Sequence, residues 1–333
     1  MTLPSKKHTI VSWVLFAVIF AGLLITATFT DLQVSQILTK GTLEPGRYLA
    51  SGLFGIVLEC LGCTAPYVLG AICFEILFIW SIRFIKNSGL KVLCGVITQG
   101  AAFATWLWVA LDVLNYNFRH YGMEGVPKPD FMKAELACVA LLLAFLTAFA
   151  VNSFSDDSIK RLFMATFAVA LAVAVSSVLV SLLKEPFGRT RYRAMNYAHD
   201  FSYYTRWYVL NGQPDREWRI ATFSSSDACR SFPSGHTQSA ALVFCIVMLK
   251  DVFGTTSKKK IALLWGSSIV WTGLVAVSRI MVGAHFFSDV LVGGTIGFLS
   301  VMLAREIFVC RGSHFKALAG KEQTEVGRNE KDS

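Results

Sequence analysis

The stretch Arg230-Ser231-Phe232-Pro233-Ser234-Gly235-His236-Thr237 lies where a long polar, aromatic-rich loop meets the apolar run 240–249. Pro233 suits the first turn of a helix, because a missing N–H costs nothing there. Ser234 and Gly235 would then present free backbone N–H groups at the helix N-terminus, where a phosphate can bind. His236 can change protonation near neutral pH. Alone, the stretch is more typical of an ordinary helix cap, so its meaning depends on the rest of the chain.

The composition is that of a membrane protein. Of the 333 residues, 54% are hydrophobic and only 16% are charged, whereas soluble domains carry about a quarter of charged residues. The net charge of +9 could suit nucleic acid. In a membrane protein, however, the distribution of basic residues carries more information than their sum, and we expect no nucleic-acid partner.

Eight apolar runs predict an all-α, polytopic transmembrane bundle, since a helix needs about 20 residues to cross a bilayer. The runs are 11–28, 65–84, 92–113, 136–149, 162–183, 240–249 with its start at Pro233, 261–277 and 286–303. The first resembles a signal peptide, but it is long and no clean cleavage site follows, which favours an uncleaved span. Residues 31–46 read as a loop. Residues 48–61 are short and contain Gly52, Gly55 and Glu59, which favours an interfacial or re-entrant helix over a true span.

Basic residues predict that both termini are cytoplasmic, because cytoplasmic loops are enriched in Lys and Arg. Alternate segments carry Lys6 and Lys7; Arg83, Lys86 and Lys91; Lys160 and Arg161; Lys250 and Lys258 to Lys260; Arg305 and Arg311. The loop 184–235 breaks the rule, since its eight Lys and Arg residues then lie outside. Positive charge kept on that side suggests that the loop holds an anion.

Three polar clusters fall on this same outer face: 184–191, 230–237 and 278–289. His285 and Asp289 are four residues apart and would share a helix face. A carboxylate there can fix the imidazole tautomer and leave the other nitrogen free to attack, although a simple stabilising pair is the alternative. Lys184, Arg191 and Arg279 can supply positive charge to phosphate oxygens.

The order and spacing of the clusters resemble the type 2 phosphatidic acid phosphatase superfamily of integral membrane lipid phosphatases, whose motifs are K-x6-R-P, P-S-G-H and S-R-x5-H-x3-D. Lys184 to Arg191 has the first spacing, and the stretches 233–236 and 278–289 are complete. The resemblance covers roughly 160–305. Tyr192 stands where the first motif usually has Pro, so we expect altered loop geometry there with the charged contacts retained.

The resemblance implies a role for each matching residue. His285 would be the nucleophile that forms a phosphohistidine, Asp289 would orient it, and His236 would protonate the leaving alkoxide. Lys184, Arg191, Ser234, Gly235 and Arg279 would bind the phosphoryl oxygens. No metal or other cofactor would be needed. The partner would be a lipid phosphate in the bilayer: a prenyl diphosphate, phosphatidate, phosphatidylglycerophosphate or a lipid-linked sugar phosphate.

Several alternatives stay open. A lipid phosphotransferase needs the same residues as a phosphatase. A transporter or silent scaffold is disfavoured by the intact histidines, and a vanadate-dependent haloperoxidase by the eight apolar runs. The expected organisation is N-terminal spans at 1–160, a catalytic membrane domain at 161–305 and a cytoplasmic disordered tail at 306–333. The expected location is a bacterial inner membrane with an extracytoplasmic active site.

Some residues fit no motif. Glu75 and Asp112 lie in or near apolar runs, where a carboxylate is a functional candidate. Cys60 and Cys63 form a lone C-x-x-C, for which a disulfide is favoured over a metal or redox site if that end faces an oxidising space. The aromatic loop 192–232 is either an interface anchor or a lid over the lipid headgroup. Arg189, Arg193 and Arg206 in and beside it could hold a second phosphate.

Overall fold

Seven helices of the computed structural model are long and apolar enough to cross a membrane, and the described residues, 6–120 and 130–312, contain no strand. The helices are α1 (Lys6–Leu38), α2 (Leu53–Gly62), α3 (Ala65–Phe84), α4 (Ser88–His120), α5 (Asp130–Asn152), α6 (Asp156–Phe187), α7 (Tyr192–Ala198), α8 (Arg216–Phe223), α9 (Gly235–Ala241), α10 (Leu249–Val252), α11 (Lys258–Met281) and α12 (Phe287–Phe308), with 3-10 turns η1 (Phe201–Tyr203) and η2 (Leu242–Met248). The predicted all-α polytopic bundle is confirmed.

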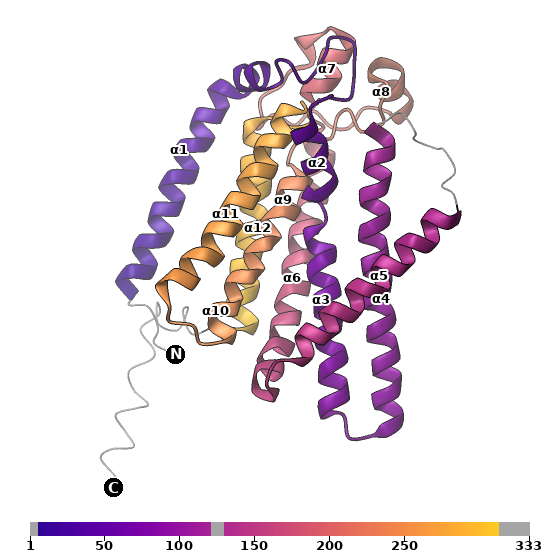
Figure 1. Ribbon diagram of the computed structural model, residues 1–333. Coiled ribbons are helices and arrows are strands. Elements are labelled where there is room, and N and C mark those ends of the chain that lie inside the picture. Colours follow the sequence, from indigo (N-terminus) through magenta and orange to yellow (C-terminus); the bar gives the residue numbers. More distant parts are fainter. Residues whose placement is uncertain (1–5, 121–129, 313–333) are drawn as a thin grey trace.

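The sixth predicted span is a broken helix. Residues 235–252 run through α9, η2 and α10 without leaving a helical path, and most of their side chains are buried against the neighbouring helices. Figure 1 shows α10 at the end of the bundle opposite to α7 and α8. Residues 235–252 therefore traverse the bundle, in addition to the seven long helices.

Residues 53–62 do not cross the membrane by themselves. α2 continues into α3 after a turn at Cys63 and Thr64, and Pro66 stands in the first turn of α3, where proline interrupts the preceding helix. Leu53–Phe84 therefore forms one interrupted span, and Figure 1 shows α2 above α3 at the same end as α7. This differs from the predicted separate interfacial or re-entrant helix.

The first helix is longer than predicted. The sequence indicated a loop from residue 31, but α1 continues to Leu38. The polar end of the helix is stable because Asp31, which is 1% exposed, is bonded to Arg189 and Ser288. Elsewhere α1 packs loosely: only 6% of its most apolar window is buried inside the protein, against 50% for α12. α12 is thus the centre of the bundle and α1 its flank.

Glycines bring α12 against the segment that begins at Ser234. A Cβ on Gly293 would overlap the carbonyl group of Ser234, and one on Gly297 would lie 2.5 Å from the carbonyl oxygen of Gln238. Small residues spaced by four let two membrane helices approach closely. This approach sets the distance between the 230–237 stretch and the start of α12, which carries Asp289, the last residue of the third motif.

The predicted tail 306–333 lies mostly outside the described residues. Among its described part, residues 306–308 still belong to α12. The three motif clusters all lie at the end of the bundle that carries α7 and α8 (Figure 1). The short connections with Arg83, Lys160 and Lys258 lie at the opposite end.

Candidate active site

The 230–237 stretch forms a tight turn into α9. The Phe232–Pro233 peptide bond is cis, Ser234 is the N-cap, and the helix begins at Gly235. Pro233 therefore precedes the cap, and its predicted place in the first helical turn is wrong. The Ser234 N–H is not free either, because it donates to the carbonyl oxygen of Asp289 at 3.0 Å. The Ser234 hydroxyl oxygen accepts from the Thr237 N–H at 3.3 Å, so this residue fixes the turn on both sides.

His285 lies in the turn between α11 and α12, with its side chain 2% exposed. Its Nδ1 is 2.6 Å from the carbonyl oxygen of Ser231. A carbonyl oxygen only accepts, so Nδ1 carries the proton and Nε2 keeps its lone pair. Burial first, and then the positive charges of Arg191 and Lys184, lower the pKa of His285 well below its ordinary value. A neutral imidazole with an unprotonated Nε2 is the form that can act as a nucleophile.

The spacing predicted that Asp289 and His285 pair on one helix face, but the structure shows no such pair. α12 begins after His285, and the Asp289 carboxylate oxygen is 3.9 Å from Nδ1, which is too long for a hydrogen bond. That carboxylate accepts from the Phe286 N–H at 2.8 Å and from the Ser231 hydroxyl at 2.5 Å. Asp289 thus holds Ser231, whose carbonyl oxygen holds His285, so its influence on the imidazole passes through Ser231.

Arg189 connects Asp289 to the first helix. Its guanidinium donates to Asp289 at 2.6 Å, to Ser288 at 2.9 Å and to Asp31 at 2.9 Å. The Asp31 carboxylate also accepts from the N–H and the hydroxyl of Ser288. All four side chains are almost fully buried. A buried charge network of this kind is favourable only when every member is bonded, which is the case here.

The three predicted phosphate-binding cations come from the end of α6, the residue just before α7 and the end of α11. The Lys184 ammonium donates to the Arg230 carbonyl at 2.9 Å. A Cβ built on Gly235 would lie 4.0 Å from Lys184 Cε. Arg191 forms an ion pair of 2.5 Å with Asp227, and Arg279 donates to Glu59 at 3.0 Å. Nε of Arg191 and Nε and Nη1 of Arg279 are buried with no hydrogen-bond partner. Buried N–H groups left unbonded are costly, so these donors are suited to an incoming anion.

His236 faces the N-terminal half of the chain. Its Nε2 lies 3.5 Å from the hydroxyl of Tyr116 on α4, and a Cβ on Gly62 would lie 3.7 Å from its Cδ2. His236 is half-buried, while His285 is fully enclosed. Both predicted catalytic histidines thus lie at the same end of the bundle, and His285 is the more deeply buried of the two.

Tyr192, which replaces the usual motif proline, is the first residue of α7. That position also suits proline, because its N–H needs no partner within the helix. The Tyr192 ring is buried beside Phe286, at 6.4 Å between ring centroids. Tyrosine thus takes a helical position compatible with proline and adds packing next to His285.

Five residues that the motifs did not indicate support the site: Asp31, Glu59, Tyr116, Asp227 and Ser231. Glu59 is 3% exposed and lies between Arg279, at 3.0 Å, and Arg193, at 3.7 Å. Acidic residues in apolar stretches were the signal that could have identified Asp31 and Glu59. No local pattern marks Tyr116 or Asp227, because their partners are more than 30 residues away in the chain.

Other sequence expectations are changed by the structure. All eight cysteines are free, so Cys60 and Cys63 form no disulfide; the Cys63 thiol donates to Asp112 instead. Arg189 is committed to Asp31 and Asp289. Arg206 is an exposed residue bonded to Tyr208. Arg189 is therefore not available for the second phosphate that the sequence suggested.

The aromatic loop 192–232 packs against the end of the bundle where the three motif clusters lie. Its Tyr204 ring packs on Phe286, and Trp207 bonds to Thr28 of α1. Among the residues that the structure describes, no group of three or more His, Cys, Asp or Glu side chains could hold a metal ion.

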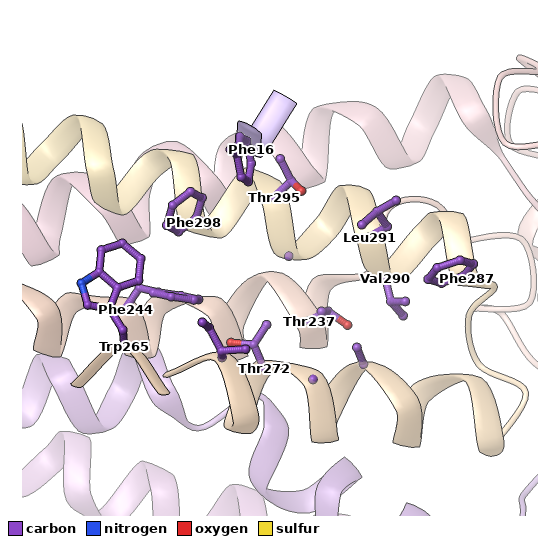
Figure 2. A pocket seen from close by; sticks show the side chains of 14 residues that line it. Phe16, Thr237, Phe244, Trp265, Thr272, Phe287, Val290, Leu291, Thr295 and Phe298 are labelled. Atoms are coloured by element: carbon purple, nitrogen blue, oxygen red, sulfur yellow. The ribbon is translucent and has the colours of Figure 1, made fainter. Parts of the chain in front are cut away.

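A separate apolar pocket lies between α1, α11 and α12 (Figure 2). Its volume is about 380 Å³, and its walls include Phe16, Trp265 and Phe298. None of its lining side chains is ionisable. One of its lining residues, Thr237, is bonded to Ser234 of the site. The pocket is therefore a gap between apolar helices and not the place where the charged groups converge.

Comparison with known proteins gives three matches to bacterial enzymes. Lipid A 1-phosphatase of Rhizobium johnstonii is 29% identical over 144 residues, 43% of this chain and 48% of the relative. Lipid A 1-phosphatase of Rhizobium etli is 26% identical over 187 residues, 55% and 69% of the two chains. Phosphatidylglycerophosphatase B of Bacillus subtilis is 37% identical over 79 residues, which are 22% of this chain and 37% of the relative. The match thus spans about half the length of the first relative.

No solved structure matches the chain. The family described as the PAP2 superfamily matches residues 165–311. That range includes all three motif clusters and ends just after α12, while Asp31, Glu59 and Tyr116 lie outside it. Residues 165–311, which carry the three motif clusters, thus match the PAP2 superfamily, the type 2 phosphatidic acid phosphatase superfamily that the motif spacing resembles.

Proposed function

We propose that this protein is an integral membrane phosphatase that hydrolyses a lipid phosphate through a phosphohistidine on His285. The observation that carries the proposal is the bond between Nδ1 of His285 and the Ser231 carbonyl, 2.6 Å long, which leaves Nε2 as the free, unprotonated nitrogen. Nucleophilic catalysis needs this state. The names of the relatives, lipid A 1-phosphatase and phosphatidylglycerophosphatase B, support a lipid phosphate monoester as substrate.

The reaction proceeds in two steps. Nε2 of His285 attacks phosphorus, the bond from phosphorus to the ester oxygen breaks, and the departing alkoxide takes a proton from His236. Water then attacks the phosphohistidine; His236 accepts a proton from that water, and the N–P bond breaks to release phosphate. The Nδ1–H bonded to Ser231 remains in place throughout, so the carbonyl dipole stabilises the positive ring that forms on phosphorylation.

The phosphoryl oxygens would bind the free donors of Arg191 and Arg279, the Lys184 ammonium, Ser234 and the Gly235 N–H. Arg191 would exchange its bond to Asp227 for one to phosphate, since the Asp227 carboxylate now occupies one side of its fork. Fork-shaped guanidinium groups bind planar pairs of oxygens well. These groups meet the negative charge of the transition state without a metal ion.

The test is phosphate release by the detergent-purified protein, without divalent metal, from lipid A-type 1-phosphate, phosphatidylglycerophosphate and phosphatidate. His285→Gln should lose at least about 1,000-fold in kcat. His199→Asn is a matched control, because His199 is exposed outside the site and Asn tolerates its positive φ. A phosphohistidine trapped by rapid quenching should disappear in His285→Gln. Normal turnover in that variant would refute the proposal.

The expected side of the membrane also stays a proposal. The site end would face the extracytoplasmic space of a bacterial inner membrane, because the basic short connections lie at the other end (Figure 1). A cysteine at Lys259 should react on intact cells only with permeant reagents, and one at the exposed Leu210 with impermeant reagents as well, each compared with the parent protein. The reverse pattern would invert the topology.

A further inference from the structure

A half-buried carboxylate on α4 has no role in the chemistry described so far. Asp112 lies inside a membrane-spanning segment, and the Cys63 thiol donates to it at 3.4 Å. Among the described residues no Lys, Arg or His forms an ion pair with Asp112. A carboxylate in a span without a cationic partner is costly and usually serves a function. Glu75, the other carboxylate that the sequence singled out, accepts from Gln99 instead, at 3.3 Å.

Two contacts of neighbouring residues connect Asp112 to His236. Tyr116 follows Asp112 by one helical turn on the same face of α4, and its hydroxyl lies 3.5 Å from Nε2 of His236. From the opposite direction, Gly62 precedes Cys63, and a Cβ there would lie 3.7 Å from the His236 ring. Cys63, Asp112 and Tyr116 therefore form a polar cluster, here the leaving-group wall, next to the histidine proposed to protonate the alkoxide.

We propose that the leaving-group wall binds the alcohol part of the substrate and selects a headgroup with a hydrogen-bond donor next to the phosphoester. The inference rests on the proposed phosphatase function, since it places the leaving oxygen at Nε2 of His236. The Asp112 carboxylate oxygens accept hydrogen bonds, as they do from the Cys63 thiol, and carboxylates are among the stronger acceptors. A hydroxyl or amide N–H on the neighbouring carbon of a sugar or glycerol headgroup would give Asp112 a second donor, beside the weakly donating Cys63 thiol.

The Asp112 carboxylate would also disfavour the binding of two other substrates. In a prenyl diphosphate the leaving group is itself a phosphate, and its negative charge would lie beside Asp112, where like charges repel. In phosphatidate the diacylglycerol leaving group carries no free donor, so binding it would desolvate Asp112 with no new hydrogen bond beyond the one from the Cys63 thiol. The wall thus favours phosphate monoesters of headgroups that carry a donor.

A matched pair of substrates tests the inference: phosphatidylglycerophosphate and the analogue whose headgroup lacks the free hydroxyl, with identical acyl chains. The wild-type protein should prefer the hydroxylated substrate by about 10- to 100-fold in kcat/KM, as expected for a bond to a charged acceptor. Asp112→Asn should reduce this preference to about threefold or less, mainly by slowing the hydroxylated substrate. Glu75→Gln, the same chemical change at another carboxylate in the spans, should keep the full preference.

The outcomes separate the two proposals. Turnover of both substrates at equal rates, or a preference that survives Asp112→Asn, would refute the leaving-group wall while leaving the phosphatase intact. Faster turnover of a prenyl diphosphate than of either monoester would do the same. No phosphate release from any lipid, with a folded protein, would refute the phosphatase itself and the inference with it.

Discussion

Asp31 and Arg189 are 158 residues apart in the chain and form a buried ion pair of 2.9 Å. The pair ties the first helix to the arginine that holds Asp289. Asp31→Asn leaves that arginine with one counterion fewer, and breaking a buried pair typically costs about 3 kcal/mol or more. We expect a clearly lower midpoint of thermal unfolding in detergent and a reduced kcat. Glu44→Gln is the matched control, because its pair with Arg47 is exposed and contributes less than about 1 kcal/mol. Equal midpoints for the two variants would contradict a structural role for the first helix.

Glu59 is the counterion of two buried arginines, Arg193 and Arg279. Glu59→Gln keeps the shape but removes the charge, so the arginines repel one another and the folded state is destabilised. A tetrahedral anion in the site would restore negative charge. We therefore expect vanadate to raise the unfolding midpoint more in Glu59→Gln than in the wild-type protein. In Glu75→Gln, vanadate should act as it does in wild type. No extra stabilisation by vanadate would show that Glu59 lies apart from the anion site.

Asp227 competes with phosphate for Arg191. Burial alone would raise the pKa of Asp227, but Arg191 and Lys184 outweigh it and lower the pKa, so the carboxylate is ionised at neutral pH and must be displaced. Asp227→Asn should tighten inhibition by vanadate or phosphate by about 3- to 10-fold, because an uncharged amide is displaced more easily. Asp215→Asn, at an exposed acidic residue of the same loop, should not change the inhibition constant. Weaker inhibition in Asp227→Asn would mean that Asp227 positions Arg191 for binding.

The pH dependence of kcat/KM follows from His285. Burial and the neighbouring cations lower its pKa well below 6.5. A lowered pKa means that the neutral, nucleophilic form persists as the pH falls through 6.5, and is lost only at more acidic pH. The acid limb of kcat/KM should therefore have its midpoint below 6.5. Lys184→Gln removes one of the cations and should move the midpoint to higher pH. A midpoint above 6.5 in the wild-type protein would contradict a neutral His285.

The local sequence pattern was sufficient to predict the membrane-spanning helices and to identify the motif residues. The length of each apolar run identified its span, because the bilayer sets one length for all of them. α3 was predicted with its bounds, 65–84, since Pro66 and the polar residues after Phe84 mark both ends. The predicted helix boundaries were wrong where a partner far away in the chain stabilises a polar residue. α1 extends past Asp31 because Arg189 and Ser288 bind that carboxylate, and neither lies near it in the chain.

The sequence by itself determined the membrane-spanning class, the three motif clusters and their common end of the bundle, because these depend on hydrophobicity and spacing along one chain. Only the tertiary structure decided which groups meet. It assigned the Nδ1 proton of His285 to the Ser231 carbonyl instead of Asp289, paired Arg191 with Asp227 and Arg279 with Glu59, and brought Tyr116 to His236. The physical reason is that a hydrogen bond or ion pair depends on distances of about 3 Å, and packing between helices sets those distances independently of separation in sequence.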